Sequence, residues 1–133
     1  MLTYNQKKSK LRHYNSYLIA REEYKEKYME LYTEATKITP HINETGGGSG
    51  SFNNDKLSDQ CAKLVEISNK IEWYDSQIKK MDKALNSLPF YHRKLIKIID
   101  IDNVSVYRAS RMLRRSYNSV KASHEKALEN IKL

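Results

Sequence analysis

The side chains best suited to chemistry in this chain lie in residues 105–128, at helical spacing. Tyr117, Asn118 and Lys121 fall at the start of a predicted helix whose N-cap is Ser116. An asparagine amide can pair with the edge of adenine, and a lysine can reach guanine or a phosphate. These residues therefore predict contact with the bases of duplex DNA; ordinary solvated polar surface is the alternative.

Other polar side chains of the same segment are predicted to contact phosphates. Such contacts position a protein on the duplex without reading its sequence. Solvated surface is again the alternative. The predicted phosphate contacts are four arginines and two serines, namely Arg108, Arg111, Arg114, Arg115, Ser116 and Ser119.

Two short helices would position these side chains. The first is expected at about residues 105–113, Arg114 and Arg115 form the turn, and the second runs to about Ile131. Val120 and Leu128 would point to a small core, which is typical of a helix-turn-helix with one helix in the major groove. A preceding helix is expected to begin near Ser87, with Pro89 in its first turn, and to end at Asp102 and Asn103. Leu95, Ile98 and Ile99 would face the same core.

Charge coincides with this predicted motif. The formal net charge is +8. Residues 88–133 hold ten Lys/Arg against four Asp/Glu, whereas residues 1–87 hold fourteen against twelve. A local basic field attracts phosphate through Coulomb steering and counterion release.

Residues 1–86 are expected to form a helical hairpin, with helices at about 3–37 and 56–86. The second carries an apolar residue at every seventh position, which favours a coiled-coil contact. Pairing within one chain and pairing between two chains both satisfy the pattern. The seam comprises Leu57, Leu64, Ile71, Ile78 and Leu85, and Cys61, Ile67, Tyr74, Met81 and Leu88 lie near the alternate positions.

The first helix carries a matching stripe rich in tyrosine, and a loop separates the two helices. The stripe comprises Leu11, Tyr14, Leu18, Tyr28, Tyr32 and Ala35, with Tyr17, Tyr24, Leu31 and Ile38 beside it. Pro40 and the Gly/Ser run after it predict a flexible linker over about residues 40–54, native or engineered, with Asn54 or Asp55 capping the next helix.

Two residue patterns carry a resemblance to known proteins. Residues 105–128 resemble the fourth conserved region of bacterial sigma factors, through Ser105, Ala109-Ser110, Leu113, Ser116, Val120-Lys121 and Ala127-Leu128. More of the chain, from Tyr24 onward, resembles the RinA/ArpU-like phage late-gene transcriptional regulators. That wider resemblance rests on the Gly-rich loop, the opening at Asp55, the step Ala62-Lys63-Leu64 and the sigma-like end.

The resemblance implies an activator of phage late genes that binds promoter DNA and contacts host RNA polymerase in the bacterial cytoplasm. His124 falls where that family usually has histidine, and phosphate contact, packing and plain exposure all fit it. Three positions depart from the family. Arg114 replaces the usual turn glycine and would need a positive φ or a different turn, and Val106 and Ala109 replace larger core residues.

Enzymatic chemistry finds no support in the pattern. The sequence contains no P-loop, dinucleotide fingerprint or zinc spacing. Cys61 is the only cysteine; it suits a reducing compartment and a buried structural thiol better than a nucleophile. Glutamates 22, 26, 30 and 34 line up at spacing four, but they lack the histidine of a carboxylate metal site. We favour a structural role for them, in which their mutual repulsion is offset if Lys56, Lys63 and Lys70 lie opposite.

The sequence thus predicts an all-α protein, with a helical hairpin at 1–86 and a helix-turn-helix domain at 87–133. The expected partner is double-stranded DNA, with RNA polymerase or a second copy of the chain as further partners. No cofactor, metal, membrane span or small-molecule substrate is expected. Two rival functions fit the same pattern: a phage DNA-packaging recognition subunit, and an interaction protein or anti-activator that does not bind DNA.

Overall fold

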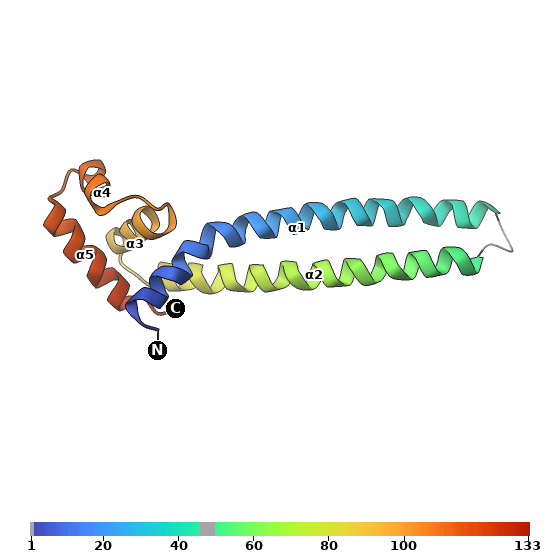
Figure 1. The fold of residues 1–133 in the computed structure, drawn as a ribbon, viewed down its shortest axis with the longest axis horizontal. Coiled ribbons are helices and arrows are strands. Elements are labelled where there is room, and N and C mark those ends of the chain that lie inside the picture. The colour runs from blue at the N-terminus through green and yellow to red at the C-terminus, as the bar shows by residue number, and fades with distance from the viewer. Residues whose placement is uncertain (1, 46–49) are drawn as a thin grey trace. The chain divides into compact units, whose positions relative to one another are not determined.

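The computed structural model describes the backbone of residues 2–45 and 50–133 and the side chains of residues 2–36 and 56–133. In these residues the fold is all-α and contains no strand, as predicted (Figure 1). The helices are α1 (Tyr4–Thr45), α2 (Gly50–Asn86), α3 (Phe90–Ile96), α4 (Val106–Leu113) and α5 (Tyr117–Asn130), and a π-helical turn, η1 (Lys97–Ile101), follows α3.

The chain divides into two compact units. The core unit contains Met1–Leu18 and Ser76–Leu133, and the helix-pair unit contains Ile19–Asp75. The division therefore does not fall at residues 86 and 87, where the sequence suggested it. The first turns of α1 and the last turns of α2 belong with the C-terminal helices, because their apolar side chains share one core with α5.

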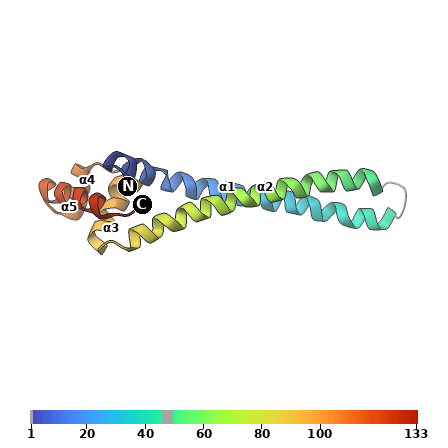
Figure 2. The ribbon, with the colours of Figure 1, turned by 90° about the horizontal axis from the view of Figure 1, so that it is seen from below.

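In the helix-pair unit, the segments of α1 and α2 run antiparallel and side by side (Figures 1 and 2). Arg21 Nη1 donates to Asp75 Oδ1 at 2.9 Å, and the rings of Tyr24 and Tyr74 stack with centroids 5.8 Å apart. The Lys70 ammonium lies 5.3 Å from the Tyr24 ring centroid. These contacts set a register within one chain, which is the hairpin solution of the seven-residue pattern.

Both long helices extend beyond their predicted ends. The backbone is helical through Pro40 to Thr45 and again from Gly50, so the expected linker at 40–54 and the expected caps Asn54 and Asp55 are wrong. A proline inside a helix costs about 3 kcal/mol, yet helical context on both sides overrides local propensity. Residues 46–49 and the Ile38 side chain lie outside the described residues.

The apolar seam is covered unevenly along α2. In the helix-pair unit, Leu57, Leu64 and Ile71 are half-buried, whereas Ile78 and Leu85 in the core unit are buried. The alternate positions Ile67 and Tyr74 are also half-buried, and Met81 and Leu88 are buried. The seam is therefore buried in the core unit and partly exposed to solvent in the helix-pair unit.

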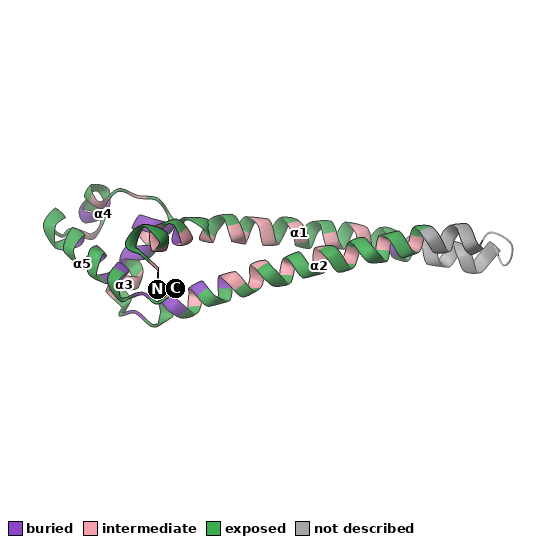
Figure 3. Cartoon of the chain, turned by 60° about the horizontal axis from the view of Figure 1, so that its bottom comes forward, coloured by how far each residue is buried: buried purple, intermediate pink, exposed green. Residues whose placement is uncertain are grey.

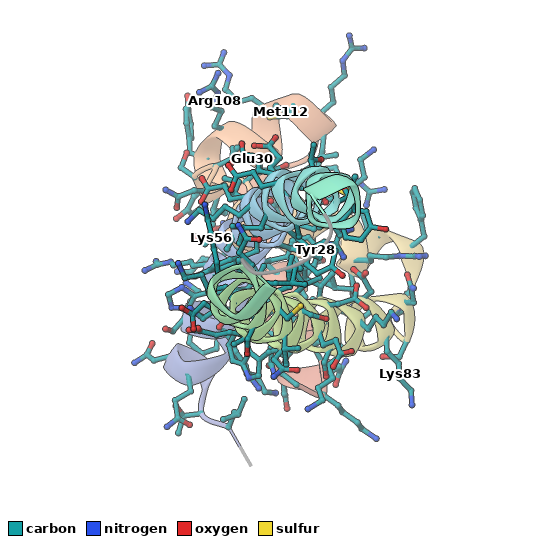
Figure 4. All side chains as sticks on the ribbon, turned by 90° about the vertical axis from the view of Figure 1, so that its right-hand side faces the viewer. Tyr28, Glu30, Lys56, Lys83, Arg108 and Met112 are labelled. Carbon is teal, nitrogen blue, oxygen red and sulfur yellow. The ribbon has the colours of Figure 1, made fainter. Side chains whose placement is uncertain are left out.

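Two seam predictions are wrong. Tyr32 is half exposed, and Cys61 is exposed where a buried thiol was expected. Two helices alone cover only a narrow stripe on each other, so side chains at the edge of a wide stripe stay in water. In the view along the helices, Tyr28 lies between α1 and α2, and Glu30 lies on the outward side of α1 (Figure 4).

The core unit holds a denser interior. One cluster joins the two long helices to the end of α5 and includes Leu11, Leu88, Ile96 and Leu128. A second cluster packs α3, α4 and α5 together and comprises Leu95, Ile99, Ala109 and Val120. Figure 3 shows these buried residues gathered on α3, α5 and the adjoining ends of α1 and α2. The core positions predicted at Leu95, Ile99, Val120 and Leu128 are confirmed.

The π-helical turn η1 explains an unusual run of burial. Its wider winding is marked by the bond from the Asp102 N–H to the Lys97 carbonyl at 2.9 Å. Ile99, Asp100 and Ile101 are consecutive and all buried. The helix ends at Asp102 and Asn103 as predicted. Its start differs, because Pro89 occupies the N-cap position and the Ser87 hydroxyl donates back to the Ala84 carbonyl at 2.6 Å.

Candidate nucleic-acid interface

The helices α4 and α5 are joined by a short turn and capped by serines. The Arg108 N–H donates to Ser105 Oγ at 3.1 Å, and the Ser119 N–H donates to Ser116 Oγ at 3.2 Å. Both serines have extended backbone, as N-cap residues do. The predicted capping role of Ser116 is confirmed, and its oxygen is thereby committed to the helix, leaving its O–H free to donate.

Arg114 ends α4 in the left-handed conformation, with φ 54° and ψ 44°. The Arg115 N–H donates to the Ser110 carbonyl at 3.0 Å and closes the helix end. A residue with a Cβ pays about 1–2 kcal/mol for this conformation, and a glycine would not. The departure from the usual turn glycine is therefore met by a positive φ and not by a different turn.

The outer face of α5 begins with the residues predicted to contact bases. Asn118 and Lys121 are exposed and Tyr117 is 45% exposed. On the opposite face, Val120 and Ala127 have no exposed surface. The first two turns of α5 therefore present polar side chains outward from a fixed apolar anchor.

Ala122 was missed by sequence reasoning. It is exposed on α5 one turn after Asn118, and Glu125 follows it on the same side. An alanine lets a helix approach a groove closely and can contact a thymine methyl. The sequence does contain a sign of this position, because residues four apart, such as Asn118 and Ala122, lie on the same face of a helix. The carboxylate of Glu125 limits a phosphate-facing surface to the first half of the helix.

The four predicted arginines are all exposed, and two are oriented by aromatic rings. Arg111 Nη1 donates to the Tyr107 hydroxyl at 3.1 Å. The Arg115 guanidinium lies 4.4 Å from the Tyr91 ring centroid, which ties the turn to α3. Arg108 projects from α4, as does the exposed Met112 (Figure 4). Ser119 is also exposed, and its N–H is used by the cap.

His124 does not face outward. It is buried, and its Nε2 and Asp100 Oδ2 share a hydrogen bond of 2.6 Å. The pair joins η1 to α5 across the interior of the core unit. Burying a carboxylate is costly unless it is hydrogen-bonded, so the pair fixes how α5 lies on η1. Of the three possibilities open for His124, namely phosphate contact, packing and plain exposure, packing is confirmed.

Two side chains of α1 make further hydrogen bonds within the core unit, one near the end of α5 and one at the end of η1. Lys7 Nζ donates to the carbonyls of Leu128 at 2.9 Å and Glu129 at 3.1 Å, near the end of α5. An ammonium there satisfies free carbonyls and complements the helix dipole. Asn15 Nδ2 donates to the Ile101 carbonyl at 3.1 Å, at the end of η1.

The formal charges of the two units have opposite signs. The core unit contains 17 Lys/Arg and 5 Asp/Glu, a balance of +12. The helix-pair unit contains 7 Lys/Arg and 11 Asp/Glu, a balance of −4. The positive excess of the chain therefore belongs entirely to the unit that holds α4 and α5.

Among the described residues, no cluster of three or more His, Cys, Asp or Glu side chains is placed to hold a metal ion. Glu22 pairs with Lys25 on its own helix at 3.6 Å, and Lys70 pairs with Glu66 at 3.7 Å.

No helix in the described part of the chain is both long and apolar enough to cross a membrane.

Comparison of the chain with protein-family models, with curated proteins and with solved structures found no match.

Proposed function

We propose that this protein is a sequence-specific DNA-binding transcriptional regulator whose core unit docks α5 in the major groove. The observation that carries the proposal is the capped start of α5. It presents Asn118, Lys121 and Ala122 outward, in a unit whose charge balance is +12. An α-helix fits the major groove, where each base pair displays its own pattern of donors and acceptors.

In this mechanism the arginines of α4 and the turn bind phosphates on both sides of the groove. Arg108 and Arg111 lie on α4, and Arg114 and Arg115 lie at the turn. All four arginines therefore come before α5, the proposed reading helix, in the chain. The Ser116 hydroxyl and the free N–H groups of the first turn of α5 add phosphate donors. Asn118 then pairs with adenine, Lys121 reaches guanine, and Ala122 contacts a thymine methyl.

The regulatory role rests on the sequence resemblance described above. Activation of phage late genes, with contact to host RNA polymerase, is the form of regulation that the resemblance implies. The helix-pair unit would serve oligomerisation or partner binding in this scheme. A two-fold dimer would require half-sites about one helical turn apart.

A titration of the full chain against labelled duplexes tests the proposal. The duplexes are a phage late-promoter region, a packaging-site duplex and a scrambled control, each at several salt concentrations. We expect tighter binding to the promoter duplex, with log affinity falling linearly in log salt. A preference for the packaging site instead would assign the protein to the packaging machinery.

Two further outcomes overturn the proposal. Equal binding to all three duplexes would mean that α5 does not read bases. Absence of binding at low salt would remove DNA as a partner, and would favour an interaction protein that acts without DNA.

A further inference from the structure

A pocket of about 390 Å³ on the core unit combines an apolar floor with a rim of lysines. Met81 is 2% exposed and Ala84 is 6% exposed, and both line it. Lys10 comes from α1, Lys80 and Lys83 from α2, and Lys132 follows α5. None of the residues that line it has an acidic side chain, whereas four of them are lysines.

Other pockets of the same unit lack this combination. The one beside Phe90 includes Asp102, and the one beside Tyr4 includes Glu125 and Glu129. Among the described residues, the four rim lysines take part in no ion pair. The rim is therefore an unmatched positive field around an apolar depression, and such a site favours an anion that also carries apolar surface.

We propose that this pocket, the lysine pocket, docks an acidic segment of a partner protein that inserts one large apolar side chain between the four lysines. A side chain of the leucine or phenylalanine type would fill the floor over Met81 and Ala84. Carboxylates on either side of it would meet the rim lysines, which are Lys80 and Lys83 of α2, Lys10 of α1 and Lys132 after α5. Charge complementarity of this kind gives specificity and a fast association rate.

Duplex DNA fits the lysine pocket less well than an acidic peptide. A phosphate backbone supplies charge but nothing apolar for the floor. The pocket also lies beyond the last turn of α5, about 20 Å along the helix from Tyr117 at 1.5 Å per residue. A partner in the lysine pocket therefore leaves the first turns of α5 free, and the inference does not depend on DNA binding.

Fluorescence anisotropy with the full chain tests the inference. The probe is a labelled synthetic peptide in which aspartates and glutamates flank a single phenylalanine. One control peptide replaces the acids with their amides, and a second replaces the phenylalanine with alanine. We expect the parent peptide to bind and both control peptides to lose roughly tenfold or more in affinity.

Variants of the protein locate the binding. Lys80→Glu with Lys83→Glu reverses the rim, and Gln77→Trp fills the pocket without changing its charge. The matched control, Lys56→Glu with Lys63→Glu, makes the same charge change in the helix-pair unit. The rim and filling variants should each weaken the peptide roughly tenfold. The control should change its affinity less than about twofold.

The remaining outcomes overturn the inference. Equal losses in the rim and control variants would indicate attraction to net charge alone. Full binding of the alanine peptide would show that the apolar floor is not used. Stoichiometric displacement by duplex DNA would assign the lysines to nucleic acid, and no binding of the parent peptide would remove the site. Helical circular dichroism of each variant verifies that it folds, and Gln77→Trp keeps the test decisive if the rim variant does not.

Discussion

The core unit and the helix-pair unit differ in charge, in burial and in the kind of contact that holds them. The core unit carries +12 and has fully buried side chains such as Leu95, Ile96 and Leu128. The helix-pair unit carries −4, and its seam residues Leu64 and Ile71 are only half-buried. The same chain thus forms a basic unit with a well-buried interior and an acidic unit whose two helices bury each other only in part.

The two units also differ in how firmly their helices are held in place. In the core unit, Lys7 and His124 tie α5 to α1 and to η1, and Asn15 ties η1 to α1, so hydrogen bonds connect all three elements. In the helix-pair unit the described interhelical contacts include the Arg21 to Asp75 pair, the stacked rings of Tyr24 and Tyr74 and the Lys70 ammonium on the Tyr24 ring. They set the register along a two-helix seam. The hydrogen bonds of the core unit are the kind of support that the DNA-reading role proposed for α5 requires.

The largest effect should come from truncating a side chain in the interior of the core unit. Leu128→Ala removes a side chain with no exposed surface and should lower the free energy of unfolding by about 3–4 kcal/mol. Leu64→Ala, at a half-buried seam position, should cost about 1 kcal/mol. Native-state hydrogen exchange reports the two units separately. Equal losses at both positions would contradict the difference in packing.

Breaking the buried pair comes next. His124→Ala leaves the Asp100 carboxylate buried without its donor and should destabilise the core unit by about 3 kcal/mol. Urea denaturation measures the loss. Lys126→Ala on the exposed side of the same helix is the control and should change stability by less than about 0.5 kcal/mol. A similarly small effect at His124 would mean that the pair does not hold α5.

The third test separates base reading from general attraction to the basic unit. Asn118→Ala should weaken binding to the preferred duplex roughly tenfold or more and relax the preference at one base pair, leaving the scrambled duplex unaffected. Asn130→Ala, at the other end of α5, should leave both affinities unchanged. Equal losses on both duplexes would reclassify Asn118 as a phosphate contact, and Lys121→Ala is interpreted in the same way.

The smallest effect concerns the turn. Arg114→Gly relieves the left-handed backbone and should raise stability by about 1 kcal/mol, and loss of its charge should reduce the salt dependence of DNA binding by about one phosphate. Arg115→Gly removes the same charge without relieving a positive φ. It should reduce the salt dependence equally but not stabilise the protein. Stabilisation by both variants would contradict the strain at Arg114.

The C-terminal half was predicted well because its signals are local. Ser105 and Ser116 cap their helices through hydrogen bonds three residues away, and such bonds depend only on nearby sequence. The apolar spacing of Val120, Ala127 and Leu128 likewise follows one helix face. The exposed position of the residues proposed to contact DNA was predictable for the same reason.

What the sequence did not reveal depends on distant partners. The bond between His124 and Asp100 joins residues on two elements, and a lone carboxylate in an apolar run was its only local sign. The helical stretch through Pro40 was missed because local propensity weighs a proline without its context. The lysine pocket collects rim residues from three separate parts of the chain, so no spacing rule points to it.

The hydrogen bond from Lys7 to Leu128 has a consequence for how the protein is made. The two residues are 121 positions apart, so at ribosomal speed roughly ten seconds separate their synthesis. Residues of the first turns of α1 must therefore wait until nearly all of the chain has been translated before they find their core. The helix-pair unit, which is continuous in sequence, is free to pair first. Folding of the basic unit is thus a late event in translation, and nascent chains that stall before α5 would lack this helix and the core that it completes.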